Sequence, residues 1–333
     1  MPPGVATFLR TRFACTDDEV LREELRERKL VPDQIHPDID PARAGNVCDS
    51  LQSRLTLSEP ELKKVVLKLP SVLGYSFEAN IEPLLARLQS RLQLSDLELQ
   101  KLVLRRPTLL GLSFEANIEP TLAAVQSRLS LSEPELKKVV LARAYFLGLS
   151  YEADMESSLA ALQSRLSLSD PELKSVVLKL PLVLGSRYEA NIEPSLAVLQ
   201  SLLSLDEPEL KKFVLKEPAL IGLSSEDNVA PTLAFIQTAF SLSADELRER
   251  VRVKPRLVSC SLDQRYRPRV ALMSALGVVV ARETLHTVAM HTDVKFMAWL
   301  RNKQEQSLTD EDWKALCSLP LLERADSLHN RLK

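Results

Sequence analysis

Apolar residues near the start of the chain follow the spacing of two successive helices. The first stripe has the spacing i, i+3, i+4, i+7 and consists of Leu62, Val65, Val66 and Leu69. The second stripe is longer and consists of Ile81, Leu84, Leu85, Leu88 and Leu92. Each stripe gives one apolar face of a helix, so this stretch predicts a pair of amphipathic helices.

Capping residues set the ends of these two helices. Ser58 and Glu61 form a capping box before the first helix, and Pro70 stops it. A tight turn through Gly74 leads to the second helix, whose first turn contains Pro83. The same Ser or Asp with Glu three residues later recurs at Ser95/Glu98, Ser132/Glu135, Ser169/Glu172, Asp206/Glu209 and Ser243/Glu246.

The whole pattern repeats with a period of 37 residues. Prolines mark one column at Pro70, Pro107, Pro181, Pro218 and Pro255, with Ala144 in the remaining position. Glycines mark a second column at Gly74, Gly111, Gly148, Gly185 and Gly222. A helix pair of this size cannot bury its apolar face alone, so neighbouring copies must stack. The pattern therefore predicts an all-α solenoid of six tandem repeats.

Three segments follow from this periodicity. The repeat array spans approximately residues 48–269, without insertions or deletions between copies. Residues 1–47 form an N-terminal tail and helical cap, and residues 270–333 form a C-terminal helical cap. The handedness of the superhelix is left open.

The repeat motif resembles that of the mitochondrial transcription termination factor (mTERF) family. The resemblance rests on PSVLGYSFEANIEPLL from Pro70, PTLLGLSFEANIEPTL from Pro107 and PLVLGSRYEANIEPSL from Pro181. HTDVKFMAWL from His291 is similar to the helix that often closes these arrays. The resemblance implies a curved solenoid of helical triplets, located in mitochondria or chloroplasts. It also implies binding of organellar double-stranded DNA or RNA, to affect transcription termination or initiation, RNA processing or ribosome assembly.

The sequence departs from that family beside the second proline of each repeat. Where many family members have Lys or Arg, this chain has pairs such as Glu82 and Leu84. Only the sixth repeat has the basic form, RYRPR, with Arg265, Arg267 and Arg269. The copies are also unusually alike, which favours recognition of a backbone or a shape over a site-by-site sequence code.

Charge is unevenly distributed along the 333 residues. Lys and Arg number 43 against 45 Asp and Glu, so the net charge of −2 excludes a uniformly basic surface. The stretch 246–270 nevertheless has three acids against eight cations, a net +5, and its cations are Arg248, Arg250, Arg252, Lys254, Arg256, Arg265, Arg267 and Arg269. Guanidinium groups fork onto phosphate oxygens, so we expect nucleic-acid contact here. The alternative is a solvated helix face with local ion pairs, such as Glu246 with Arg250.

Three other repeat columns are candidates for binding. Four cations in one column have no acid at i−4 or i−3 and could track a phosphate backbone: Lys68, Arg105, Lys179 and Lys216. A solvated ladder of cations is the alternative. Glutamines occupy one column in all six repeats, from Gln52 to Gln237. We expect their side chains to form hydrogen bonds between adjacent helices rather than to contact bases. The aromatic column of Phe77, Phe114, Tyr151 and Tyr188 is interpreted as helix packing rather than base stacking.

A further column, with Lys63, Lys137 and Lys174, is interpreted as an exposed helix face that binds nothing. Removing charge at Arg265, Arg267 and Arg269 is therefore expected to weaken nucleic-acid binding more than removing charge from that column.

Catalytic chemistry is sparse. The four cysteines and four histidines have no metal-ligand spacing, and there is no phosphate-binding glycine motif. We predict no enzymatic activity and no cofactor. No apolar run is long enough to cross a membrane. Arg10 and Arg12 precede the first acid, Asp17, which is compatible with a transit-peptide remnant; a frayed N-terminal tail is the alternative.

Two classes of function remain. One is a nucleic-acid-binding solenoid, expected to be a monomer, acting in organellar gene expression with transcription or ribosome-assembly proteins as further partners. The other is a protein-binding scaffold of HEAT-like kind without nucleic-acid affinity, which the mildly acidic first five repeats favour. The choice between DNA and RNA stays open.

Overall fold

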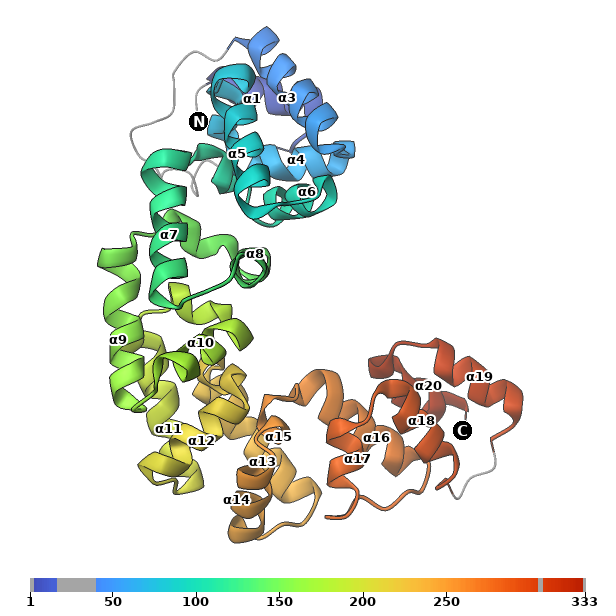
Figure 1. The fold of residues 1–333 in the computed structure, drawn as a ribbon. Coiled ribbons are helices and arrows are strands. Elements are labelled where there is room, and N and C mark those ends of the chain that lie inside the picture. Colours follow the sequence, from blue (N-terminus) through green and yellow to red (C-terminus); the bar gives the residue numbers. More distant parts are fainter. Residues whose placement is uncertain (1–2, 17–39, 305–307, 332–333) are drawn as a thin grey trace. The chain divides into compact units, whose positions relative to one another are not determined.

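The computed structural model describes residues 3–16, 40–304 and 308–331, and all regular structure in these residues is helical (Figure 1). This confirms the all-α solenoid of tandem repeats predicted from the sequence. The chain divides into two compact units: Met1–Leu159 with Pro181–Gly185, and Ala160–Leu180 with Ser186–Lys333. The predicted array limits, 48 and 269, stay a prediction.

Each repeat consists of a short α-helix, a one-turn helix, a π turn and a second α-helix that follows the π turn directly, so that these last two segments together form the long helix of the repeat. The first copy contains α4 (Glu59–Lys68), the 3₁₀ helix η1 (Pro70–Gly74), the π turn η2 (Phe77–Ile81) and α5 (Glu82–Leu92). The second copy contains α6 (Asp96–Arg105), η3 (Pro107–Gly111), η4 (Phe114–Ile118) and α7 (Glu119–Arg128). The third contains α8 (Glu133–Ala142), η5 (Ala144–Gly148), η6 (Tyr151–Met155) and α9 (Glu156–Arg165).

The remaining copies keep this order. The fourth contains α10 (Asp170–Lys179), η7 (Pro181–Gly185), η8 (Tyr188–Ile192) and α11 (Glu193–Leu203). The fifth contains α12 (Glu207–Lys216), η9 (Pro218–Gly222), η10 (Ser225–Val229) and α13 (Ala230–Ala239). The sixth contains α14 (Ala244–Val253), α15 (Arg256–Ser259), η11 (Leu262–Tyr266) and α16 (Arg267–Ala275).

Helices outside the repeats cover both ends. At the N-terminal end, α1 (Pro3–Phe13) packs on α3 (Pro41–Leu55), with Leu9 fully buried. Residues 17–39 of the predicted tail lie outside the described residues. The C-terminal helices are α17 (Leu285–Met290), α18 (Asp293–Arg301), α19 (Asp310–Ser318) and α20 (Leu321–Arg331). Of these, α20 packs against α16.

The predicted stripes and caps are present. Leu62, Val65 and Val66 have no exposed surface, and the stripe of α5 from Leu84 to Leu92 is buried. All six capping boxes form, because each cap residue bonds the backbone three residues on while the glutamate there bonds back. Local sequence and burial therefore specify the same helices.

The structure differs from the predicted turn between the two helices. Ser76 Oγ accepts from the Ala79 N–H at 3.1 Å, and Asn80 Oδ1 accepts from the Ser76 N–H at 3.0 Å. These reciprocal bonds wind the SFEAN segment into a π turn, so helical structure resumes at Phe77. In the third copy Ala144 replaces the proline and the 3₁₀ helix still forms, so proline is not required for it.

The glycine column serves close packing rather than backbone conformation. Among the described glycines only Gly277 has a positive φ. A Cβ on Gly111 would lie 3.2 Å from the Tyr75 hydroxyl, and one on Gly148 would lie 2.8 Å from Arg106 Nη2. A side chain of the preceding copy therefore packs against each of these glycines.

One residue after α3 and after each long helix from α5 to α13 adopts the left-handed conformation without being glycine, whereas α16 is followed by Gly277. Its φ is 51° at Thr56, 49° at Gln93 and 48° at Ser167. This backbone region is unfavourable for L-residues with a Cβ by about 1–2 kcal/mol. The backbone of these residues is therefore strained, and a substitution by glycine should relieve the strain.

We predict that Ser167→Gly raises the thermal midpoint, with a gain of about 0.5–1 kcal/mol, because glycine adopts this conformation without strain. The control is Ser164→Gly, an exposed Ser→Gly change inside α9, which should destabilise by roughly 0.5 kcal/mol. Thermal melting followed by circular dichroism measures both. A lower midpoint for Ser167→Gly would contradict the strain argument.

Candidate nucleic-acid interface

The basic stretch 246–270 lies on α14, α15, η11 and α16, and most of its cations are already engaged. Arg248 pairs with Asp245 at 2.8 Å, and Arg267 pairs with Asp263 at 3.2 Å. Arg252 Nη2 donates to the carbonyl oxygen of Ser204 at 2.6 Å. These three contacts are local bonds within the protein, which the sequence analysis gave as the alternative to nucleic-acid contact.

Arg265 and Arg269 join the sixth repeat to the C-terminal helices. Arg265 Nη1 donates to the carbonyl oxygens of Ala289 at 3.1 Å and His291 at 3.0 Å. Arg269 has no exposed surface, and its Nη1 donates to the carbonyl oxygens of Val288 and His291 at 2.7 and 2.9 Å. Both arginines therefore serve as internal hydrogen-bond donors.

The expectation that Arg269 contacts phosphate is wrong, because its guanidinium is inside the protein. It pairs with Asp293 at 2.5 Å and lies 4.7 Å from the ring centroid of Phe296. Smaller hydroxyl residues hold this column in other copies: Thr121 donates to the carbonyl oxygen of Leu149, and Ser195 donates to that of Leu223. Arg269 likewise donates to backbone carbonyl oxygens of the element that follows, but through a longer side chain.

Three cations of the stretch stay available. Lys254 and Arg256 are exposed and Arg250 is half-buried, and none of them makes an ion pair with another described residue. Lys254 follows α14 in the repeat column of Arg106 and Arg143, and Arg256 begins α15 in the repeat column of Tyr145.

Two members of the predicted cation column act as caps on the next copy. Arg105 Nη1 donates to the carbonyl oxygen of Leu141 at 2.6 Å, and Lys179 Nζ donates to that of Leu215 at 2.9 Å. Cations at helix C-termini are favoured by the helix dipole. Lys68 and Lys216 make no hydrogen bond or ion pair through their side chains to described residues.

In the first unit, Lys68 and Arg105 line one groove of about 690 Å³. The groove follows the ends of α4, α6 and α8 and the 3₁₀ helices η1, η3 and η5. Four further side chains that sequence reasoning missed line it: Tyr75, Arg106, Arg143 and Tyr145. We call these six residues the first-unit groove.

Arg106 is the central side chain of the first-unit groove. Its guanidinium lies 4.4 Å from the ring centroid of Tyr145, and its Nε and Nη1 are buried without a hydrogen-bond partner. Burial lowers the pKa of Arg106, and the positive charge of Arg143 acts in the same direction. An unpaired charged donor is unfavourable by at least about 1–3 kcal/mol, so the site favours an anionic acceptor.

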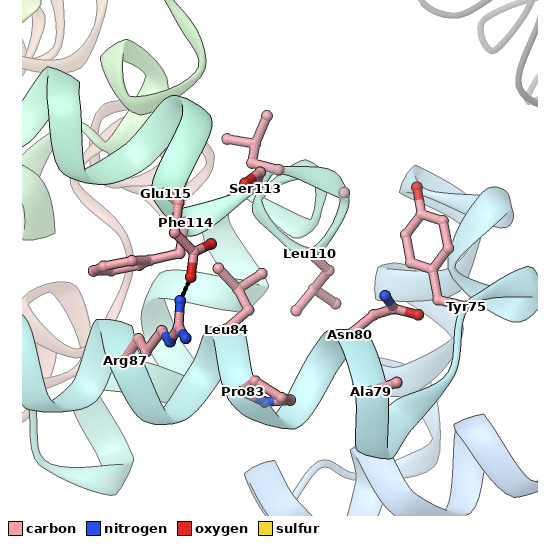
Figure 2. A pocket seen from close by; sticks show the side chains of 12 residues that line it. Tyr75, Ala79, Asn80, Pro83, Leu84, Arg87, Leu110, Ser113, Phe114 and Glu115 are labelled. Carbon is pink, nitrogen blue, oxygen red and sulfur yellow. Dashed lines mark ion pairs between the residues drawn. The ribbon is translucent and has the colours of Figure 1, made fainter.

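A second pocket, of about 480 Å³, shares Tyr75, Gly111 and Leu112 with this groove (Figure 2). Arg87 and Glu115 form an ion pair at one end of it, and Tyr75 lies at the other end (Figure 2). The Arg87 guanidinium also lies 5.9 Å from the ring centroid of Phe114. Tyr75 therefore lines both cavities.

Two overlapping segments of the chain, residues 39–152 and 117–297, match the mTERF family model. Together they cover well over half of the sequence. The chain belongs to the mTERF family. No curated protein matches the chain in a sequence comparison. Membership supports, in general terms, a role in organellar gene expression through nucleic acid.

The mTERF repeats of this chain are joined by a polar ladder on their long helices. Arg91 Nε donates to both carboxylate oxygens of Glu119 at 3.0 and 3.1 Å, its Nη2 donates to Gln126 at 2.7 Å, and its Nη1 donates to Glu133 at 2.7 Å. Gln126 Nε2 then donates to Glu133 at 2.9 Å. The same column provides Arg54 with Glu82 and Gln89, Arg128 with Glu156, and Arg165 with Glu193, Gln200 and Glu207.

This polar ladder confirms that the glutamine column is structural. The aromatic column shares acids with this ladder, because the hydroxyls of Tyr151 and Tyr188 donate to Glu156 and Glu193. These contacts raise the pKa of both tyrosines, with burial as the larger cause. Phe77, Phe114 and Tyr151 are half-buried and Tyr188 is buried, which agrees with packing between helices.

The lysine column that was interpreted as an exposed face also joins repeats, so that interpretation is wrong. Lys137 Nζ donates to the carbonyl oxygen of Gln93 and pairs with Glu98, both at 2.8 Å. Lys211 makes the same contacts with Ser167 and Glu172. The side chain of Lys137 is only 26% exposed, so its column is unsuitable as a control surface.

Within the described residues, no helix is both long and apolar enough to cross a bilayer. The same residues contain no group of three or more His, Cys, Asp or Glu placed to hold a metal ion.

We predict that Arg269→Ala destabilises the protein by at least about 2 kcal/mol, because hydrogen bonds to charged groups contribute roughly 1.5–3 kcal/mol each. The matched control is Arg267→Ala, whose exposed ion pair with Asp263 should contribute under about 1 kcal/mol. Urea denaturation measures both. Equal small effects would show that the internal bonds of Arg269 are dispensable.

The contact between Glu98 and Lys137 predicts a pH dependence. The Lys137 bond and the Ser95 backbone bond lower the pKa of Glu98 from 4.5 to about 2. A depressed folded-state pKa contributes stability above the unfolded value, and this contribution is lost as pH falls from 4.5 towards 2. We expect Glu98→Gln to lower the thermal midpoint at pH 7 and to lose less than wild type on acidification.

The control for this pH dependence is Glu226→Gln, since Glu226 is exposed and forms no ion pair with a described residue. Its melting curve should follow that of wild type at every pH. If Glu98→Gln and Glu226→Gln behave alike, the contact between repeats contributes nothing to acid sensitivity.

Proposed function

We propose that this mTERF-family protein binds nucleic acid in the first-unit groove and thereby regulates organellar gene expression in mitochondria or plastids. The observation that carries the proposal is Arg106, whose Nε and Nη1 are buried without a hydrogen-bond partner, beside an aromatic ring and in a groove with three further cations. A phosphate oxygen that enters the groove would supply the missing acceptor.

The tyrosines favour nucleic acid with unpaired bases. Tyr145 is 51% exposed although Arg106 covers one face of its ring, and Tyr75 lies one repeat away. Bases stack on exposed aromatic rings while cations follow the backbone, and neither contact needs a particular sequence. This agrees with the similarity between copies, which argues against a code of one base per repeat.

Within the second unit, Lys254 and Arg256 are separate candidates for phosphate contact. Lys254 occupies the repeat column of Arg106 and Arg143, and Arg256 occupies the repeat column of Tyr145. Lys179 and Lys216 belong to the column of Lys68 and Arg105, and the capping bond of Lys179 reduces its availability. We therefore rank the first-unit groove above the basic stretch 246–270.

Electrophoretic mobility assays over a salt series test the proposal. Several phosphate contacts predict that log affinity falls against log salt with a slope of roughly −3 to −6. Single-stranded RNA and DNA should bind more tightly than a duplex of the same sequence. Absence of binding at about 50 mM salt would refute nucleic-acid binding.

Two variants locate the site. Arg106→Leu and Arg143→Leu place in copies two and three the leucine that copies one and four have as Leu69 and Leu180, so the fold should tolerate them. We predict that the double variant weakens binding roughly tenfold or more and makes the salt slope about 1–2 less steep.

The matched control for these variants is the double change Lys64→Ser and Lys138→Ser, in an exposed column that has Ser175 in the fourth copy. It removes the same charge and should change affinity less than about twofold, because no ligand-binding feature lies beside it. Equal losses in both double variants would show that only net charge matters.

A further inference from the structure

The polar ladder stops at one point in the second unit. The next member of the column after Arg165 is Leu202, and Ala230 and Ala244 replace the two acids that an arginine there would bind. The three changes occur together, so the ladder is removed as a set. Only the glutamine of this set, Gln237, is retained.

A groove of about 220 Å³ lies at this break, between α11, α13 and α14. Its apolar lining includes Leu202, Leu203, Leu233 and Ala244. Leu202 is 42% exposed, and α13 contains no charged residue. A volume of this size accommodates one large apolar side chain.

Two polar side chains line the groove as well: Gln237 and Arg248. Gln126 and Gln200, the equivalents of Gln237, each bond an arginine and an acid, whereas the side chain of Gln237 makes no hydrogen bond to a described residue. Among the residues that the structure describes, Arg248 forms an ion pair with Asp245 alone, whose side chain is 91% exposed, and such a surface pair contributes at most about 1 kcal/mol. The groove thus combines an apolar floor, a free amide and a cation.

We propose that this groove binds an amphipathic helix of a partner protein, which inserts one leucine- or phenylalanine-sized side chain and carries a carboxylate beside it. The apolar side chain would fill the space between Leu203 and Leu233, Gln237 would bond a polar group next to that anchor, and Arg248 would pair with the carboxylate. Anchors of this kind dominate helix-in-groove recognition. The proposal is independent of the nucleic-acid function, because the first-unit groove and this groove have no residue in common.

The probe is a fluorescein-labelled synthetic helix of about four turns with a leucine stripe and flanking glutamates, titrated with the full chain by fluorescence anisotropy. We expect micromolar affinity. Replacing the leucines by alanine, or the glutamates by lysine, should each weaken binding at least roughly tenfold. No binding up to about millimolar protein, or equal binding of the lysine peptide, would overturn the proposal.

The decisive variant rebuilds the polar ladder: Leu202→Arg with Ala230→Glu and Ala244→Glu. The column has an arginine with two acids ahead of it at four other places, Arg54, Arg91, Arg128 and Arg165. We therefore expect this variant to fold with an equal or higher thermal midpoint. It should no longer bind the peptide. The control, Leu97→Arg with Ala123→Glu and Ala160→Glu, adds the same charges at exposed positions elsewhere and should bind like wild type.

Two further results would also overturn the proposal. Equal peptide binding by the rebuilt variant would place the peptide elsewhere. Self-association in sedimentation velocity that the rebuilt variant abolishes would assign the groove to a second copy of this chain. RNA binding measured in parallel separates the two functions, because the rebuilt variant should retain it and Arg106→Leu should not affect the peptide.

Discussion

No single repeat of this protein can bury its own apolar stripes, and this constraint determines most of the structure. Leu62 and Val65 of a short helix, and Leu85 and Leu88 of a long helix, lose all their exposed surface only when adjacent copies stack. Stacking at a fixed period places the same side chains opposite each other in every copy. A hydrogen bond or ion pair that stabilises one contact between copies can therefore form with the same geometry between the next two copies.

The recurrent bonds explain most of the charged residues. Arginines of the polar ladder bond residues 28 and 35 positions ahead, and Lys137 and Lys211 bond carbonyl oxygens 44 positions back. Positions where one copy differs from the others are therefore the ones that indicate candidate binding sites. Arg106, Arg143 and Tyr145 occupy columns that are apolar or small in the first copy or the fourth, and Leu202, Ala230 and Ala244 remove the ladder from one interface.

The fold was predictable from the sequence because its signals are local. Capping boxes, stripes and the period specify the helices and their order. The position of Gln89 beside the apolar stripe of its own helix indicated that the glutamine column is structural. The π turn was not predicted, because it depends on two side-chain bonds that the apolar period does not reveal: Ser76 Oγ accepts from the Ala79 N–H, and Asn80 Oδ1 accepts from the Ser76 N–H. Arg269 and Lys137 were misjudged for another reason: their partners lie in the next element or the preceding copy, so a search for acids three or four residues away missed them.

The candidate groove could be predicted only in part. Lys68 and Arg105 stood out as a column, whereas Arg106 stands out only once Tyr145 and Gly148 of the following copy are placed around it. Ultraviolet crosslinking of the full chain to single-stranded RNA containing 4-thiouridine, with the attachment sites mapped by mass spectrometry, tests this placement most directly. Crosslinks at Tyr75 and Tyr145 that disappear at high salt are predicted. Crosslinks confined to the helices from α16 onward, with none in the first-unit groove, would contradict the account.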